Sequence, residues 1–250
     1  SAPEALDMLK SKVDAFQAFT TDSLRIGVSP HAPYTVCEPL YRSTGAYAAA
    51  EDLPITAHIA ESVDEVCFVQ NATGPFAENW RSRGIPVVER HCTPIAYLND
   101  LGLLGRNMLL IHAIEADEKD LKLIHDSGSP VVHCPKSNAK LAHQIAKVSS
   151  MHHHGIPLCL GTDSVASNNV VDMFEEMRAA IFMQRQFTGN VHALAARDVF
   201  RMATIQGAQC LGLDKRLGSL DPGKRADFCV VDLGAPAAQP VYDPIETMVY

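Results

Sequence analysis

The chain lacks long apolar runs and any targeting signal at its start. No apolar stretch approaches the ~20 residues that a helix needs to cross a bilayer, and no basic-then-apolar leader opens the sequence. The seven cysteines are scattered and include no Cys-x-x-Cys pair, which predicts reduced thiols in a cytoplasmic protein and not a disulfide framework. Because Ser1 stands where an initiator methionine would, we expect a piece of a longer protein.

The chain also lacks an excess of basic residues. Its 21 lysines and arginines are outnumbered by 29 aspartates and glutamates, which gives a formal charge of −8. This balance argues against nucleic acid or an anionic membrane as partner and leaves a small-molecule substrate. Neither a glycine-rich phosphate loop nor a nucleophile elbow occurs. With 47% hydrophobic and 20% charged residues over 250 positions, we expect one large or two modest globular domains.

What the chain does contain is an alternation of short apolar runs with helix-like segments. Apolar residues at helical spacing predict a helix over residues 6–16, and further helices are predicted at 118–126 and 172–185. The five predicted strands are 24–28, 54–59, 108–112, 130–133 and 156–161. This alternation is typical of βα units and predicts an α/β fold with a parallel sheet.

Polar side chains follow each predicted strand. His31, His58, His112 and His133 stand at or just after the ends of four strands, and Asp163 follows the fifth. In a β/α barrel the active site is built at the carboxyl ends of many strands, whereas an open doubly wound sheet binds its ligand at one crevice. The sequence therefore favours a (β/α)8 barrel.

The number of strands is too small for a closed barrel, which needs eight. The missing three would precede residue 24, so we expect residues 1–216 to form a partial barrel of about strands 4–8, with an exposed edge at its first strand. After a last helix near residues 203–211, the turn-rich segment 218–227 leads into the apolar run 228–231. These features predict a small β module over residues 217–250.

The polar residues at the strand ends have two interpretations. His58 with Glu61 can be an ordinary polar pair, Asp163 can cap the turn after its strand, and His31 and His112 can be core histidines. Alternatively, His58 and Asp163 bind a metal ion, which lowers the pKa of a bound water to about 7, and Glu61 holds a proton for the substrate. The coincidence of four histidines and one aspartate at consecutive strand ends favours the second interpretation.

Four motifs resemble those of a known superfamily. They are Ser29-Pro-His-Ala-Pro-Tyr-Thr35, Ala57-His-Ile-Ala-Glu-Ser62, His133-Cys-Pro-Lys-Ser-Asn138 and Leu160-Gly-Thr-Asp-Ser164. With Ser167-Asn-Asn169 and the segment 218–227, they resemble the amidohydrolase superfamily over nearly the whole chain. The similarity is to the branch of S-adenosylhomocysteine/methylthioadenosine deaminases, aminofutalosine deaminases, guanine deaminases and s-triazine chlorohydrolases.

The resemblance implies a hydrolytic deaminase of an aminated purine or adenosine-like substrate, in which metal-activated hydroxide attacks a ring carbon and ammonia leaves. His58 and Asp163 would bind one divalent ion, zinc or alternatively iron, and Asp163 would also act as a base. His112 would orient or deprotonate the attacking water. Glu61 would carry a proton to the ring nitrogen and, with His31, contact the substrate. The family fold is a distorted β/α barrel with a small β-sandwich built from both chain ends.

The chain departs from the family in one important respect. The His-x-His pair of the first barrel strand, which supplies two metal ligands, has no counterpart at a strand end; His152 and His154 have this spacing but precede the last predicted strand. An s-triazine-type chlorohydrolase and a non-catalytic fragment or remnant therefore stay open as alternatives. Glu61 favours deamination, because a protonated carboxyl group can donate to the leaving amine. The exact substrate and a homo-oligomeric state are left open.

Overall fold

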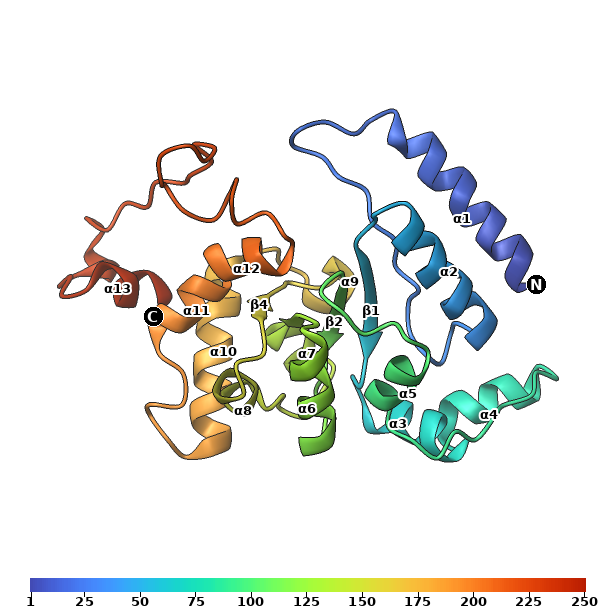
Figure 1. Cartoon of the computed structure of the whole chain (residues 1–250). Helices are drawn as coiled ribbons and strands as arrows, with labels where there is room; N and C mark the ends of the chain where they lie inside the picture. The colour runs from blue at the N-terminus through green and yellow to red at the C-terminus, as the bar shows by residue number, and fades with distance from the viewer. The chain divides into compact units, whose positions relative to one another are not determined.

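The computed structural model describes all 250 residues and divides them into two compact units, Ser1–Ser129 and Pro130–Tyr250 (Figure 1). All seven cysteines are free thiols. None of the helices combines the length and the apolar character that a membrane span requires. The predicted boundary at residue 217 is a different one, and it stays a prediction.

Unit 1 contains two strands and six helices. They are α1 (Ala2–Gln17), α2 (Glu38–Ala50), β1 (Ile55–Ile59), α3 (Val63–Asn71), α4 (Gly74–Ser82), α5 (Pro94–Asp100), β2 (Met108–His112) and α6 (Glu118–Ser127). The strands β1 and β2 are parallel, with Ile55 opposite Met108 and Ile59 opposite His112. Because the register is continuous, both strands end at the same level. Figure 1 shows α2 beside α1 in this unit.

Unit 2 contains two shorter strands, seven α-helices and one 3-10 helix. They are β3 (Val131–His133), α7 (Pro135–Lys140), α8 (Val148–His153), β4 (Leu158–Leu160), α9 (Val165–Asn168), α10 (Met173–Thr188), α11 (Ala196–Met202), α12 (Ile205–Cys210), the 3-10 helix η1 (Pro236–Ala238) and α13 (Pro244–Val249). The strands β3 and β4 are parallel, with Val131 opposite Leu158. Helices α10, α11 and α12 pack against β4.

The apolar cores follow the predicted strands. In unit 1, Ile59 and Leu110 are fully buried on adjacent strands, as is Leu121 on α6. In unit 2, Met151 of α8 and Ile181 of α10 are fully buried. The α/β class with parallel strand pairing is confirmed, and four of the five predicted barrel strands and the four predicted helices occur at or within a few residues of their expected positions.

The prediction of a strand at residues 24–28 is wrong. Only Val28 pairs with β1, through a single parallel bridge to Ile55. Leu24, which bridges back to Thr21 in a tight turn, is half exposed, and Arg25 is exposed as well. Since these side chains bury little surface and their backbone groups find no ladder, the apolar pattern alone does not produce a strand.

The prediction of a strand at residues 228–231 is also wrong. These residues are irregular, and Phe228 and Val230 are largely exposed. Their β-branched and aromatic composition suits a strand, but a strand needs a neighbour to accept and donate its backbone hydrogen bonds. The segment from residue 217 onward contains η1 and α13 as its regular structure, and its membership of a β module stays a prediction.

Candidate active site

The carboxyl ends of β1 and β2 in unit 1 gather four of the predicted site residues. The rings of His31 and His58 have centroids 4.8 Å apart, and those of His58 and His112 are 5.5 Å apart. Nε2 of His112 lies 3.6 Å from Oε1 of Glu61. His112 is 1% exposed and Glu61 13%, so this imidazole and carboxyl group interact where water screens them little.

The backbone turns sharply where these strands end. Ala60, directly after β1, has φ = 50°, while His112 and Ala113 at the end of β2 have φ = 77° and 47°. Non-glycine residues rarely adopt positive φ, which costs roughly 1–2 kcal/mol each. Backbone hydrogen bonds hold the two ends, from Ala113 N to Ile59 O and from Glu115 N to Ala60 O. The turn at Ala60 lets Glu61 approach the end of β2 although it lies three residues beyond His58.

A backbone carbonyl fixes the tautomer of His58. Nδ1 of His58 lies 3.1 Å from the carbonyl oxygen of His31, and a carbonyl only accepts, so Nδ1 carries the proton. In the neutral ring, Nε2 then presents its lone pair. Metal-binding histidines are oriented by a hydrogen bond of this kind from their second nitrogen. The observed bond therefore fits His58 as a metal ligand.

A buried glutamate that the sequence analysis did not identify supports the turn after β1. Oε1 and Oε2 of Glu65 accept hydrogen bonds from the backbone amides of Ala60 and Glu61, each at 2.8 Å. Burial, with the nearby charges of Glu61 and Glu115, raises the pKa of Glu65 to about 8, although the two amide donors oppose this rise. The pattern Ser62-x-x-Glu65 marks a capping box and was the available signal.

Aromatic contacts order the loop that carries His31. Tyr34 stacks on Phe76 of α4 with centroids 4.0 Å apart, and its ring meets the His31 ring edge-on at 5.9 Å. Nε1 of Trp80 donates a hydrogen bond of 2.6 Å to the carbonyl oxygen of Tyr34. A mostly apolar cavity of about 750 Å³ borders this loop at Pro33–Cys37, and the three site histidines and Glu61 of unit 1 do not line it.

Asp163 lies in unit 2, directly after β4. It has φ = 57°, so this strand too ends in a turn with a non-glycine residue in the left-handed region. Its Oδ2 accepts hydrogen bonds from the hydroxyls of Ser137 and Ser167, each at 2.6 Å. Hydroxyl donors of this kind stabilise the ionised form of a carboxylate. The two hydroxyls therefore fix the orientation of the Asp163 carboxylate.

A second buried glutamate supports the turn after β4. Nδ2 of Asn168 donates to the carbonyl oxygen of Thr162 and to Oε1 of Glu176, both at 2.6 Å. Oε2 of Glu176 accepts a hydrogen bond from the backbone amide of Lys136. Burial raises the pKa of Glu176. Asn168 thus connects the residue before Asp163 to a carboxyl group in the core of unit 2.

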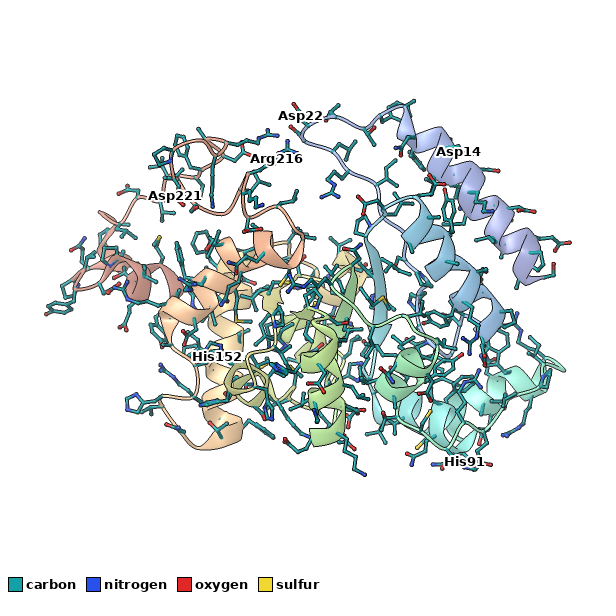
Figure 2. The ribbon with its side chains drawn as sticks, viewed as in Figure 1. Asp14, Asp22, His91, His152, Arg216 and Asp221 are labelled. Atoms are coloured by element: carbon teal, nitrogen blue, oxygen red, sulfur yellow. The ribbon has the colours of Figure 1, made fainter.

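Three further histidines are not part of the cluster of unit 1. His133 ends β3 and is buried, and its carbonyl oxygen accepts a hydrogen bond from Gly161 N beside β4. His152 lies in the last turn of α8 and is exposed (Figure 2), and Gly155 follows with φ = 69°, as a left-handed helix stop. His91 is exposed on the loop before α5 (Figure 2).

The donor atoms of the predicted site suit a divalent metal ion. His58 and His112 each offer an imidazole nitrogen, and Asp163 offers a carboxylate oxygen. Zinc accepts both kinds of ligand. The family motifs predict metal binding by His58 and Asp163 alone and an interaction of His112 with the attacking water. The hydrogen-bonded tautomer of His58 and the two hydroxyl donors to Asp163 are the features that fit such an ion.

The chain is similar to proteins of known families. It matches the sequence model of the amidohydrolase family over residues 2–250. A 5-methylthioadenosine/S-adenosylhomocysteine deaminase of Syntrophobacter fumaroxidans is 38% identical over 227 residues, which are 91% of this chain and 48% of that protein. A 5'-deoxyadenosine deaminase of Methanothermobacter thermautotrophicus is 35% identical over 229 residues, 92% of this chain and 49% of that protein.

Solved structures of related enzymes have a similar fold. An adenosine deaminase from Xanthomonas campestris with bound zinc superposes with a TM-score of 0.84 at 31% identity, covering 99% of this chain and 52% of that one. Guanine deaminase of Escherichia coli superposes with a TM-score of 0.80 at 20% identity, which shows a shared fold alone. The chain spans about half the length of the relatives that it matches. The resemblance stated from the four motifs is confirmed.

Proposed function

The chain belongs to the amidohydrolase family, and we propose that it forms part of a zinc-dependent hydrolytic deaminase of adenosine-like compounds. The observation that carries the proposal is the cluster of His58, Glu61 and His112 at the ends of β1 and β2, with Nδ1 of His58 bound to a carbonyl. The names of the relatives support an aminated purine nucleoside as the substrate class.

We assign the metal ligands by their donor chemistry and by the family motifs. His58 binds through Nε2, and Asp163 binds through its carboxylate, which its serine partners orient. A zinc ion bound by these residues would lower the pKa of a water molecule, which could then act as the nucleophile. We favour one zinc ion over iron because the solved relative from Xanthomonas campestris contains zinc.

Glu61 and His112 carry out the proton transfers in this proposal. Glu61 would donate its proton to a ring nitrogen of the substrate, regain the proton that the attacking water releases, and pass it to the leaving amine. This role needs a group beside the carboxyl that can exchange protons with it. Nε2 of His112, 3.6 Å away and buried, is such a group and also orients the attacking water. His31, exposed and with its Nδ1 2.9 Å from Thr35 Oγ1, contacts the substrate with its other edge.

A non-catalytic role is the second candidate. It is favoured by one observation: no His-x-His pair lies on any of the four strands, and the pair His152 and His154 belongs to the exposed end of α8. With His58 and Asp163 as protein ligands, the site has fewer than the three that a catalytic zinc usually has. Tested alone, the 250-residue chain is therefore expected to bind zinc weakly and to release little or no ammonia.

The decisive experiment compares the chain with a fusion protein in which an upstream segment bearing a His-x-His strand precedes Ser1. Zinc content is measured together with ammonia release from adenosine, methylthioadenosine, S-adenosylhomocysteine, guanine and an aminofutalosine-like compound. We expect zinc and turnover in the fusion protein. Chloride release from a chlorinated s-triazine tests the related chlorohydrolase activity. A fusion protein that holds zinc but acts on none of these compounds would refute the deaminase proposal.

Further features of the whole protein are proposals as well. Residues 1–216 would belong to the barrel and residues 217–250 to the composite β-sandwich, as the family motifs in these segments suggest. The seven free thiols suit a reducing compartment, which supports a cytoplasmic location. Limited proteolysis of the fusion protein tests the boundary, because cleavage near residue 217 marks an exposed junction. Sedimentation of the same protein tests whether it is a homo-oligomer.

A further inference from the structure

The start of α3 departs from an ordinary capping box. In such a box the N-cap hydroxyl accepts from the third helical residue, and the side chain of that residue returns to the N-cap amide. Helix α6 follows this pattern, since Oδ2 of Asp120 accepts from the amide of Asp117 at 3.1 Å. In α3 the hydroxyl of Ser62 accepts from Glu65 N at 3.3 Å, but the Glu65 side chain bonds elsewhere.

Glu65 reaches past the N-cap to the two residues before it. Its Oε1 accepts from Ala60 N and its Oε2 from Glu61 N, both at 2.8 Å. The side chain is fully buried, although burial of a carboxyl group is unfavourable and capping a helix does not require it. The two bonds fall on the strained residue Ala60 and on the residue whose carboxyl group meets His112.

The turn is thereby fixed from both sides. The amide of Ala60 is held by Glu65, and its carbonyl oxygen accepts from Glu115 N at 2.8 Å at the end of β2. With φ of Ala60 held at 50°, the direction of the Glu61 side chain is set relative to β2. Catalytic groups depend on such support, because a misplacement of about 1 Å can cost roughly 10²-fold in rate.

We propose that Glu65 is a positioning residue, which holds the backbone of Ala60 and Glu61 so that the Glu61 carboxyl group lies beside Nε2 of His112. The proposal rests on the role of Glu61 as proton carrier in the proposed function. The contacts on which it is based all lie within unit 1. Burial also raises the pKa of Glu65, which agrees with a side chain retained for its acceptors despite an unfavourable environment.

The variant Glu65→Gln tests the proposal because glutamine has one oxygen and one NH₂ group in place of two oxygens. One of the two amides then faces a donor, and the turn relaxes. The matched control is Ser62→Ala, which weakens the same helix start but leaves both acceptors of Glu65 in place. Glu65→Asp is made alongside, since its shorter carboxylate can still sit at the helix start yet cannot span both amides.

The first readout is the ¹⁵N signal of His112 Nε2 in the full 250-residue chain, assigned with a His112→Asn variant. We expect Glu65→Gln and Glu65→Asp to move this signal in the direction that Glu61→Gln moves it, while Ser62→Ala leaves it at the wild-type position. If Glu65→Gln does not fold, Glu65→Asp decides. A His112 signal unchanged in the Glu65 variants but moved in Glu61→Gln overturns the proposal.

The second readout is turnover by the zinc-loaded fusion protein. Glu65→Gln is expected to lower kcat by about 10²-fold with little change in KM, because the substrate contacts remain while the proton carrier is displaced. An equal loss of kcat in Ser62→Ala would show that Glu65 acts only by stabilising the start of the helix. If the wild-type fusion protein itself shows no turnover, the proposed function fails, and the His112 signal still decides the positioning role.

Discussion

The turns after β1 and β4 both position an acidic residue beyond a strand, but they do so with different hydrogen bonds. Each follows a parallel strand, each places a residue at positive φ, and each is supported by a buried glutamate. In unit 1, Glu65 binds the backbone of the turn, and the Glu61 carboxyl group lies beside an imidazole. In unit 2, two serine hydroxyls bind the Asp163 carboxylate itself, and Glu176 acts through Asn168.

The difference separates two uses of a carboxyl group. Hydroxyl donors on a carboxylate oxygen favour its charged form, which suits a residue that stays ionised and binds a cation. A carboxyl group positioned through its backbone, with an imidazole as neighbour, can take up and give away a proton. The structure thus supports the division of roles proposed for Asp163 and Glu61 with the bonds that each turn makes.

The largest expected effect is in the turn after β4. In the fusion protein, Asp163→Asn should abolish zinc binding and lower turnover by at least ~10³-fold, because a ligand and a base are lost together. Zinc content by elemental analysis and ammonia release are measured on the same samples. Asp221→Asn, an exposed change in the same unit, should leave both at wild-type values. Zinc retained in full by Asp163→Asn would remove the contrast between the two turns.

The turn after β1 should respond differently. Glu61→Gln should keep the metal and lower turnover by about 10²–10⁴-fold, the range for removal of a general acid or base. Glu78→Gln, on the exposed face of α4, is the matched control. Zinc lost from the Glu61 variant would mean that both carboxyl groups hold the ion and that the proposed separation is wrong.

Removing the hydroxyl donors to Asp163 tests whether they support this side chain as a zinc ligand. The double variant Ser137→Ala/Ser167→Ala should weaken zinc affinity of the fusion protein by about 10–100-fold, as is typical for groups that orient a metal ligand. Zinc titration against a competing chelator measures this, with Ser11→Ala on α1 as control. An unchanged affinity would show that the serine hydroxyls are not needed for Asp163 to bind zinc.

The smallest expected effect is on the pH dependence of the free energy of unfolding, to which Glu65 and Glu176 should contribute differently. Glu65 ionises near pH 4.5 when unfolded and near pH 8 when folded, so its contribution is intact below about 4.5 and is lost as the pH rises to about 8. The free energy of unfolding should fall by at most about 1.4 kcal/mol per pH unit in this window. Glu65→Gln should remove this slope, as urea unfolding at several pH values can show.

Glu176→Gln should remove a slope of the same sign, because burial raises the pKa of Glu176 as well. Its effect should be weaker, since Asn168 and the Lys136 amide stabilise the ionised form of this side chain. Slopes that are equal in wild type and both variants would show that neither buried glutamate titrates in the folded state as described.

The strands that the sequence predicted correctly are those with neighbours. The runs at 54–59 and 108–112 pair with each other over five residues, whereas 24–28 meets β1 only at Val28 and 228–231 is irregular, although their apolar character is comparable. Periodicity reports which side chains prefer burial. It does not report whether another strand of the folded chain is present to complete the hydrogen bonds.

The sequence also identified some residues of the candidate site and missed others. His31, His58, Glu61 and His112 could be found because chemically distinctive side chains recur at strand ends, and unit 1 places these four together. Their catalytic roles stay predictions. Glu65 was visible only as part of a capping box, and the pattern cannot tell which amides its carboxylate reaches. Ser137 and Ser167 lay within recognised motifs without any sign that they bind Asp163.

The hydrogen bond from Trp80 to Tyr34 gives the protein an optical probe of its own. Trp80 is the single tryptophan of the chain, and its indole is bound to the loop that carries His31. Indole fluorescence shifts to longer wavelength when the ring gains water. A displacement of the His31 loop, by a ligand or by a substitution, should therefore change the emission spectrum without any label, while events confined to unit 2 should leave that spectrum unchanged.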